Sequence, residues 1–334
     1  MSDLNFLLIA SVKDEGAILW EWVAHHLLCG FTDIVIFQND STDGTVETLE
    51  TLHDAGFIRY ENNTSKYLRE TRFWKAHAHR KVTKFKEYLA ADYVLVLDAD
   101  EFLCLNDPCT NLSDLVTTLP DVPEIRLNWK LFGSNAQTQL SPQLVTERFT
   151  RTENPNRICG SLTEFKTLFK PQGFDQPAIH RPRPFSKEDA PQTNGSGLLR
   201  DEFDLGRYRS TDPAGQIFAQ INHYMLRDVE SFLLKLARGR PGKRSFKPYN
   251  YWRQRDVNSH EDKGLYRKTD ALKAKMELMD RATNGTLSRL QVEAIEYQRA
   301  QVAELMKDPI YRRIQAFCLG KDEPHQRGYQ LPYE

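Results

Sequence analysis

The sequence predicts an α/β fold, in which a mostly parallel sheet is flanked by helices and followed by a helical C-terminal extension. Two observations carry this prediction. In about the first sixty residues, apolar strand-like runs alternate with amphipathic segments, which implies right-handed crossovers between parallel strands. After residue 270, apolar residues recur at helical spacing. The 334 residues suffice for one domain at 1–245 and a mainly helical extension at 246–334.

The individual elements follow from these patterns in chain order. Asn5 to Val12 is the first expected strand, and the helix after it ends at Gly30, with Asp14 as its N-cap. Further strands are expected at 33–37, 57–60, 93–97, 124–132, 164–170, 179–180 and 216–225, and further helices at 46–55, 69–90, 112–119, 229–237 and, as a pair broken at Asn284-Gly285, across 270–307. Residues 181–197 are rich in Pro, Gly and Ser and predict a loop.

Composition disfavours several classes of protein. The net charge of −1 gives no overall field for nucleic acid, so we expect no nucleic-acid partner. The five cysteines are few and scattered, which favours reduced thiols in a cytoplasmic protein. The apolar run from Phe6 to Val12 is too short to span a bilayer and lacks the flanks of a signal peptide.

Three carboxylates follow the apolar strand expected at 93–97, namely Asp98, Asp100 and Glu101. In open α/β sheets, ligands bind outside the carboxyl ends of the strands, where these acids are expected to lie. A divalent cation would relieve both their mutual repulsion and the cost of burying them, and hard carboxylate oxygens suit Mg²⁺ or Mn²⁺. The alternative is a solvated acidic loop after a core strand.

A second polar cluster, from Gln38 to Thr45, follows the strand expected at 33–37. The first strand is not followed by a glycine-rich dinucleotide fingerprint, and the chain has no P-loop motif, which disfavours dehydrogenases and P-loop NTPases. Asp40 could instead hold a base and ribose through hydrogen bonds. The alternative is a well-capped helix with nothing bound, which explains Ser41 and Thr42 better than it explains Asp40.

Basic residues gather in two places. The helix expected at 69–90 carries several, of which Arg72 and Lys75 are candidates for phosphate contacts, because Arg and Lys are the usual phosphate partners. Residues 238–244 form a dense basic turn that could close over a diphosphate. In both places the alternative is a solvated charged surface.

Several motifs occur together and in a fixed order. They are Lys13-Asp14-Glu15, Glu21-Trp22-Val23-Ala24-His25-His26, Asn39-Asp40-Ser41-Thr42-Asp43-Gly44-Thr45 and Leu97-Asp98-Ala99-Asp100-Glu101-Phe102-Leu103, followed by Phe132-Gly133-Ser134, Glu147-Arg148-Phe149, Lys166-Thr167, His180 and Asn222-His223-Tyr224. In this combination, over about residues 5–240, the chain resembles the family 2 type glycosyltransferases of the GT-A fold. Within that group it is most similar to the bacterial subgroup related to glycosyltransferase family 92. The resemblance implies a GT-A-type, Rossmann-like sheet.

The resemblance also implies roles for individual residues. Asp40 would hold the nucleotide base or ribose, with Lys13 and Glu15 lining the same pocket. Asp100 would ligate Mn²⁺ or Mg²⁺, while Asp98 would reach the ribose or the metal site. A further metal ligand is expected from the second half of the chain, with His223 as first choice and His180 as second.

The reaction that the resemblance implies is metal-dependent transfer of a sugar, of hexosyltransferase type, from a nucleotide-sugar to an acceptor hydroxyl. UDP is the favoured nucleotide, a glycan or glycolipid is the expected acceptor, and inversion of the anomeric centre is expected. Inversion in one step needs a carboxylate base. Candidates are Glu101, Asp201, Glu202 and Asp204.

We expect a role in polysaccharide biosynthesis, a location in the cytoplasm at the inner face of the membrane, and either a peripheral membrane contact or a homodimer through the C-terminal helices. Two rival classes remain open from the sequence. One is a sugar-nucleotide pyrophosphorylase, which would want a more basic, glycine-rich first loop than Lys13-Asp14-Glu15 provides. The other is a non-catalytic carbohydrate-binding protein with the same fold.

Overall fold

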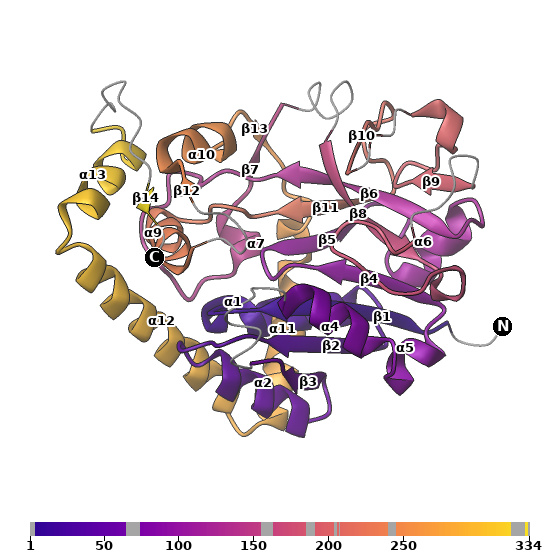
Figure 1. Ribbon diagram of the computed structural model, residues 1–334, viewed down its shortest axis with the longest axis horizontal. Coiled ribbons are helices and arrows are strands. Elements are labelled where there is room, and N and C mark those ends of the chain that lie inside the picture. The colour runs from indigo at the N-terminus through magenta and orange to yellow at the C-terminus, as the bar shows by residue number, and fades with distance from the viewer. Residues whose placement is uncertain are drawn as a thin grey trace.

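The computed structural model describes residues 4–64, 74–154, 163–184, 191–203, 206, 208–239, 245–321 and 331–332. Within these ranges, ten strands form one twisted sheet whose main path runs β3-β2-β1-β4-β8-β6-β11-β5 (Figure 1). The strands are β1 (Phe6–Val12), β2 (Asp33–Gln38), β3 (Arg59–Asn62), β4 (Tyr93–Leu97), β5 (Glu101–Leu105), β6 (Glu124–Leu131), β8 (Thr163–Phe169) and β11 (Ala219–His223), with β9 (Gln192–Asn194) beside β6 and β10 (Arg209–Ser210) beside β8. Short pairs outside this sheet join β7 (Arg151–Thr152) to β13 (His260–Glu261) and β12 (Ser245–Phe246) to β14 (Leu331–Pro332).

The first half of the sheet, β3-β2-β1-β4, is parallel throughout. Val12 and Gln38, the last residues of β1 and β2, are register partners, and Leu97 at the end of β4 pairs with Ala10. Because these strands end at the same edge, the loops that follow β1, β2 and β4 lie next to one another. The residues that the sequence predicts to form the site lie along this edge.

The apolar runs of these strands are buried on both faces, as expected for parallel strands. Leu8 and Ala10 belong to a large core that includes helix α1 (Gly16–Leu28), whereas Leu7 and Ile9 face a second core. The second core is covered by α4 (Trp74–Val82) and α5 (Lys86–Ala90). The period-two alternation of β1 therefore supplies both layers at once.

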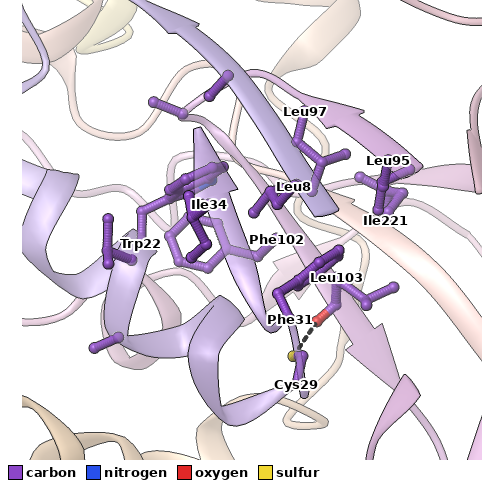
Figure 2. Packing of buried hydrophobic residues seen from close by; sticks show 14 of the residues in the cluster. Leu8, Trp22, Cys29, Phe31, Ile34, Leu95, Leu97, Phe102, Leu103 and Ile221 are labelled. Carbon is purple, nitrogen blue, oxygen red and sulfur yellow. Dashed lines mark hydrogen bonds between the residues drawn. The ribbon is translucent and has the colours of Figure 1, made fainter. Parts of the chain in front are cut away.

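Only three residues separate the end of β4 from the start of β5, but β5 pairs antiparallel with β11 at the far edge of the sheet. Its other edge lies against α1. There Trp22 Nε1 donates to Glu101 O at 2.8 Å, His25 Nε2 lies 2.8 Å from Leu103 O, and Leu103 N donates to His26 Nε2 at 3.3 Å. Figure 2 shows Trp22, Phe102 and Leu103 packed in this core. Side chains of α1 thus satisfy a strand edge that would otherwise be left open.

The remaining helices complete the layers around the sheet (Figure 1). They are α2 (Thr45–Asp54), α6 (Leu112–Thr118), α7 (Val145–Arg148), α9 (Val229–Arg238), α10 (Pro248–Arg255), α11 (Thr269–Ala282), α12 (Thr286–Leu305) and α13 (Pro309–Cys318), with single 3₁₀ turns at Pro171–Gly173, Arg200–Glu202 and Tyr266–Lys268. The C-terminal helices pack onto the sheet domain, since α11 and α12 both contact α1. The predicted class, a mostly parallel α/β sheet with C-terminal helices, is confirmed; the boundary at residue 245 stays a prediction.

Four local predictions were wrong. The helix expected at 69–90 is, in its described part, two helices, α4 and α5, separated near Phe85. Ile179-His180 is a bend and not a strand, and the loop expected at 181–197 contains strand β9. Asp14 is not the N-cap of α1: its φ is 51° and its carboxylate accepts from Thr42 N at 2.8 Å. Asp43 instead accepts from Gly16 N at 3.1 Å, so the capping carboxylate comes from a neighbouring loop.

The C-terminal helices were predicted as a pair with a break at Asn284-Gly285, and both residues adopt left-handed backbone conformations between α11 and α12. Helical spacing in this part of the sequence aligns Val292, Ile295, Val302 and Leu305 as an apolar stripe; in the structure Ile295 and Val302 are buried, whereas Val292 is 48% exposed. In the described ranges, no helix combines the length and the apolar character that crossing a bilayer requires.

Candidate active site

Asp98 lies immediately after β4, and both of its carboxylate oxygens are held by lysines. Lys75 Nζ, from α4, lies 2.5 Å from Oδ1, and Lys166 Nζ, from β8, lies 3.1 Å from Oδ2. Burial alone would raise the pKa of Asp98, but the two ammonium groups hold it well below its usual range. Asp98 is therefore ionised at neutral pH.

Asp100 is held in the same way by a different set of residues. Lys235 Nζ, from α9, lies 2.9 Å from Oδ2 and also donates to Met225 O at 2.8 Å. His223 Nε2, at the end of β11, lies 3.4 Å from Oδ1. Burial opposes ionisation here too, but Lys235 and His223 hold the pKa of Asp100 well below its usual range. Asp98 and Asp100 are thus held by different basic residues, although they lie only two positions apart in the sequence.

Glu101 is fully buried beneath these two residues. Its Oε2 accepts from Asp98 N at 2.8 Å and lies 2.9 Å from Lys166 Nζ, whereas Oε1 has no hydrogen-bond partner among the described residues. His223 Nδ1, which likewise has none in the part of the chain that the structure describes, lies 3.8 Å from that orphaned oxygen. Burial raises the pKa of Glu101, and the Lys166 ammonium opposes this effect. The two orphaned atoms face each other at the base of the acidic loop.

This arrangement fits a divalent cation at Asp100 and His223. A histidine that ligates a metal through one ring nitrogen usually donates its other N–H to a carboxylate, and Glu101 is placed to receive it from His223 Nδ1. The oxygens of Asp98 are taken by lysines, so Asp98 suits an electrostatic role better than direct ligation. Among the described residues, no group of three or more His, Cys, Asp or Glu side chains is arranged to hold a metal ion. Further ligands would be phosphate oxygens and water.

The second histidine candidate occupies a different environment. His180 Nδ1 is hydrogen-bonded to Phe165 O at 2.9 Å, and its ring lies against Trp129. Trp129 also contacts His223, with ring centroids 4.3 Å apart. Burial lowers the pKa of His180 to about 4, with Lys166 adding to the effect. Of the two histidines, His223 is the one that contacts Asp100.

The loop after β1 is tied to α9 by charged contacts. Arg238 donates to Lys13 O and lies 2.9 Å from Glu15 Oε1, and Arg227 lies 3.5 Å from Glu15 Oε2. Lys235 and Arg238 are three residues apart on α9, so they share one helix face. That face spans the loop after β1 and the loop after β4. Glu15 is thus engaged by arginines, while the half-buried Lys13 contributes its backbone carbonyl.

The loop after β2 is linked to α4. Asp40 adopts a left-handed conformation with φ of 61°, which a residue without β-branching tolerates. The neighbouring Asn39 Oδ1 accepts from Asn63 Nδ2 at 2.8 Å, and the same amide donates to Trp74 O at 2.9 Å. Trp74 precedes Lys75, the partner of Asp98. Two hydrogen bonds, the Trp74–Lys75 backbone and the Lys75–Asp98 ion pair therefore link the loop after β2 to the loop after β4.

The base candidates are dispersed. Glu101 is enclosed, as described above. Asp201 and Glu202 are exposed on a 3₁₀ turn, where Glu202 Oε2 accepts from Leu199 N at 2.7 Å. Asp204 and the phosphate candidate Arg72 lie outside the described residues. The identity of the base stays a prediction.

Sequence reasoning missed most of the cations. Lys75 was predicted as a phosphate contact and not as the partner of Asp98, Lys166 entered only as part of a motif, and Arg238 only as part of a basic turn. Lys235 and Arg227 were not singled out. The available signal was the i,i+3 pair of Lys235 and Arg238 shortly after Asn222-His223-Tyr224, because one face of an amphipathic helix then carries two cations.

A hollow of about 490 Å³ lies elsewhere, at the outer edge of the sheet. It is lined by the start of β2 and β3, including Asp33 and Arg59, and by Lys86 and Glu87 at the start of α5. These are the amino ends of the parallel strands, opposite to the edge where Asp98 lies. The hollow is therefore separate from the acidic loop.

Comparison with known proteins identifies the class. The profile of glycosyltransferase family 92 matches residues 12–260, a range that includes the loops after β1, β2 and β4 together with β11 and α9. A glycosyltransferase family 92 protein of Ricinus communis is 26% identical over 232 residues, covering 68% of this chain and 36% of that protein. The class is thus a glycosyltransferase, as predicted. Within that class, the chain belongs to glycosyltransferase family 92.

Similarity to solved structures is partial. TarS from S. aureus in complex with UDP has a TM-score of 0.31 at 11% identity, covering 50% of this chain and 47% of that one. An active-site mutant of LgtC has a TM-score of 0.32 at 12% identity, covering 66% and 87%. The mannosyltransferase Ktr4p from S. cerevisiae has a TM-score of 0.24 at 9% identity, covering 40% and 41%. At these scores none of the three bears on function.

Proposed function

We propose that the chain transfers a sugar from a nucleotide-sugar, with UDP as the nucleotide, to an acceptor hydroxyl, with inversion and with Mn²⁺ or Mg²⁺ as cofactor. The observation that carries this proposal is the joint position of Asp98 and Asp100. They lie at the carboxyl end of a parallel strand, next to the loops after β1 and β2, and are surrounded by basic side chains. Family membership supports the same class of reaction.

The proposed donor site divides into two parts. Asp40 and the loop of Lys13 and Glu15 hold the base and ribose, because carboxylates and backbone groups there can bond to ring edges and hydroxyls. Lys235 and Arg238 face the diphosphate from α9. Their ammonium and guanidinium groups now pair with protein carboxylates, and phosphate oxygens offer them equivalent acceptors.

Asp100 and His223 would hold the cation, which when bound supplies Lewis-acid stabilisation of charge on the departing diphosphate. The chain's own groups support that role. Glu101 Oε1 lies 3.8 Å from His223 Nδ1, so a small approach of the two groups when the metal binds would let Glu101 accept from Nδ1 and fix the ring, with Nε2 on the side of Asp100. Lys166 and Lys75 keep Asp98 ionised and fixed in place. A carboxylate base, among Glu101, Asp201, Glu202 and Asp204, takes the proton of the acceptor hydroxyl.

The wider setting is proposed on the same basis. The acceptor is a glycan or glycolipid, the sugar is a hexose, and the pathway is polysaccharide biosynthesis. The enzyme acts in the cytoplasm at the inner face of the membrane. Its C-terminal helices make either a peripheral contact with that membrane or the interface of a homodimer.

The test is a panel of nucleotide-sugars incubated with the full chain and Mn²⁺, with release of nucleoside diphosphate as the readout. The proposal expects release from one UDP-sugar above the others, and an anomeric inversion in the transferred or hydrolysed sugar by NMR. Consumption of nucleoside triphosphate with sugar phosphate would instead indicate a pyrophosphorylase. Metal-independent binding of free sugar without nucleotide release would indicate a carbohydrate-binding protein.

A further inference from the structure

The two loops proposed to hold the nucleotide meet at one buried carboxylate. Asp43 is 2% exposed and lies in the loop after β2. Its Oδ2 accepts from Gly16 N at 3.1 Å, in the loop after β1, and its Oδ1 accepts from Thr45 N at 3.2 Å and from Thr45 Oγ1 at 2.5 Å. One side chain therefore caps the start of both α1 and α2 and fixes the two loops relative to each other.

A fourth hydrogen bond to this carboxylate comes from the C-terminal helix α12. Gln298 Nε2 donates to Asp43 Oδ2 at 2.7 Å, and Gln298 is itself only 7% exposed. The carboxylate accepts only, so the amide must present its NH₂ group. A buried carboxylate that lost this donor would keep an unsatisfied lone pair in a site closed to water.

At the same place, Gly16 is packed too closely for a larger residue, and Gly44 lies within van der Waals distance of the same helix, α12. A Cβ added at Gly16 would lie 2.9 Å from Asp43 O and 3.1 Å from Ala294 Cβ. Gly44 adopts φ of 84°, and a Cβ there would meet the same Ala294 at 3.8 Å. Ala294 lies one helical turn before Gln298 on α12, so the two residues share a face. That face of α12 packs against the loops after β1 and β2.

The same helix also reaches the cationic side of the site. Helix α12 packs on α1, α2 and α9, and Figure 1 shows it running along one flank of the molecule past α2 and α9. Helix α9 carries Lys235 and Arg238, and α1 and α2 begin at the two loops. A single helix, whose Gln298 lies 255 residues from Asp43 in the sequence, therefore contacts three of the helices that position the proposed donor site, α1, α2 and α9.

We infer that α12 is a positioning element of the donor site and that Gln298 is the residue through which it fixes the nucleotide loops. That the ligand is a nucleotide rests on the proposed function. That Gln298 fixes the two loops rests only on the hydrogen bonds and packing described above. It follows that the helical extension is required for donor binding. Its removal would leave Asp43 without one of its donors and would uncover Gly16 and Gly44, which Ala294 now covers.

The experiment compares Gln298→Leu and Gln298→Glu with the control Gln291→Leu. Gln291 is on the same helix and donates to Ala17 O at 3.1 Å, so the control removes an amide hydrogen bond to α1 without touching Asp43. Three measurements are made on the full chain: UDP affinity with Mn²⁺ by calorimetry, hydrogen exchange of peptides covering 13–20 and 40–48 without nucleotide, and the KM and kcat for release of nucleoside diphosphate from a UDP-sugar. The melting temperature of each variant shows whether it is folded.

Both Gln298 variants are expected to exchange faster than wild type in the two loop peptides and to bind UDP about tenfold more weakly, with KM raised and kcat retained. Gln291→Leu is expected to match wild type in both. Unchanged exchange in the Gln298 variants, or the same change in the control, would overturn the inference. Wild-type chain that binds no UDP would overturn the proposed function, while faster loop exchange in the Gln298 variants would still support positioning by α12.

Discussion

The ammonium group of Lys166 lies 3.1 Å from Asp98 and, through the same nitrogen, 2.9 Å from Glu101. Lys166 is fully buried on β8, so one cation compensates two carboxylates inside the protein. Burial alone would lower the pKa of Lys166, but Asp98 and Glu101 raise it above its usual range, so the ammonium stays charged. The acidic loop depends on this residue for its shape.

Lys166→Met should therefore destabilise the fold strongly. Removing one partner of a buried ion pair leaves uncompensated charge and costs about 3–5 kcal/mol. Urea unfolding measures the difference. The control is Lys170→Met at the end of the same strand, whose Asp121 partner is exposed and whose loss should cost under about 1 kcal/mol. Equal stabilities for the two variants would contradict the assigned role of Lys166.

Arg238→Met should weaken UDP binding while leaving the fold intact. Arg238 is proposed to face the diphosphate and now pairs with Glu15, so its loss removes a charge-assisted contact, with an expected decrease in affinity of about tenfold or more. Calorimetry with UDP and Mn²⁺ makes the measurement. Arg289→Met, at an exposed Arg–Glu pair on α12, serves as the control and should bind UDP like wild type. Wild-type affinity in Arg238→Met would remove Arg238 from the site.

Asp40→Ala should weaken nucleotide binding without changing the affinity for Mn²⁺, because Asp40 is assigned to the base or ribose and not to the metal. A decrease of about tenfold is expected from the loss of one carboxylate hydrogen bond. UDP and Mn²⁺ are titrated separately. Asp33→Ala, at the opposite end of the same strand, should alter neither. An unaltered UDP affinity in Asp40→Ala would exclude the assignment.

Stability should decrease in mild acid because of His25. Burial lowers the pKa of His25 to about 4, although its ring is hydrogen-bonded to Leu103 O. The unfolded chain, in which the pKa of histidine is about 6.5, takes up this proton at a higher pH than the folded protein does. The free energy of unfolding therefore has its full value above about pH 6.5 and decreases by up to roughly 3 kcal/mol as the pH falls towards 4. Urea unfolding of His25→Gln between pH 7 and 4.5 should show a smaller loss. The control is His260→Gln, at an exposed histidine, which should lose as much stability as wild type. If His25→Gln also loses as much stability as wild type, His25 is not the cause of the decrease in acid.

The parts of the fold that sequence could predict are those set by local pattern. The apolar runs of β1, β2 and β4, and the acids that follow β4, were all found because each signal lies within about ten residues. Strand β5 was not expected, because its pairing with β11 depends on a turn at Asp98–Asp100 that carries the chain to the other edge of the sheet.

Long-range partners were beyond the sequence for a similar reason. Lys166 is 68 residues from Asp98, and Lys235 is 135 residues from Asp100. A lysine on a strand or helix has no local mark that distinguishes a buried ion pair from a solvated charge. Asp43 and Gln298, 255 residues apart, illustrate the same limit for a hydrogen bond. These contacts are fixed by topology, which the local pattern does not encode.

Asp100 is proposed to hold a cation on which nucleotide binding depends. The decisive measurement is a titration of UDP into wild type and Asp100→Asn, each with and without Mn²⁺. Mn²⁺ should tighten UDP binding by about tenfold or more in wild type and should have no effect in a folded Asp100→Asn. If Mn²⁺ changes the UDP affinity equally in both proteins, Asp100 does not hold the cation.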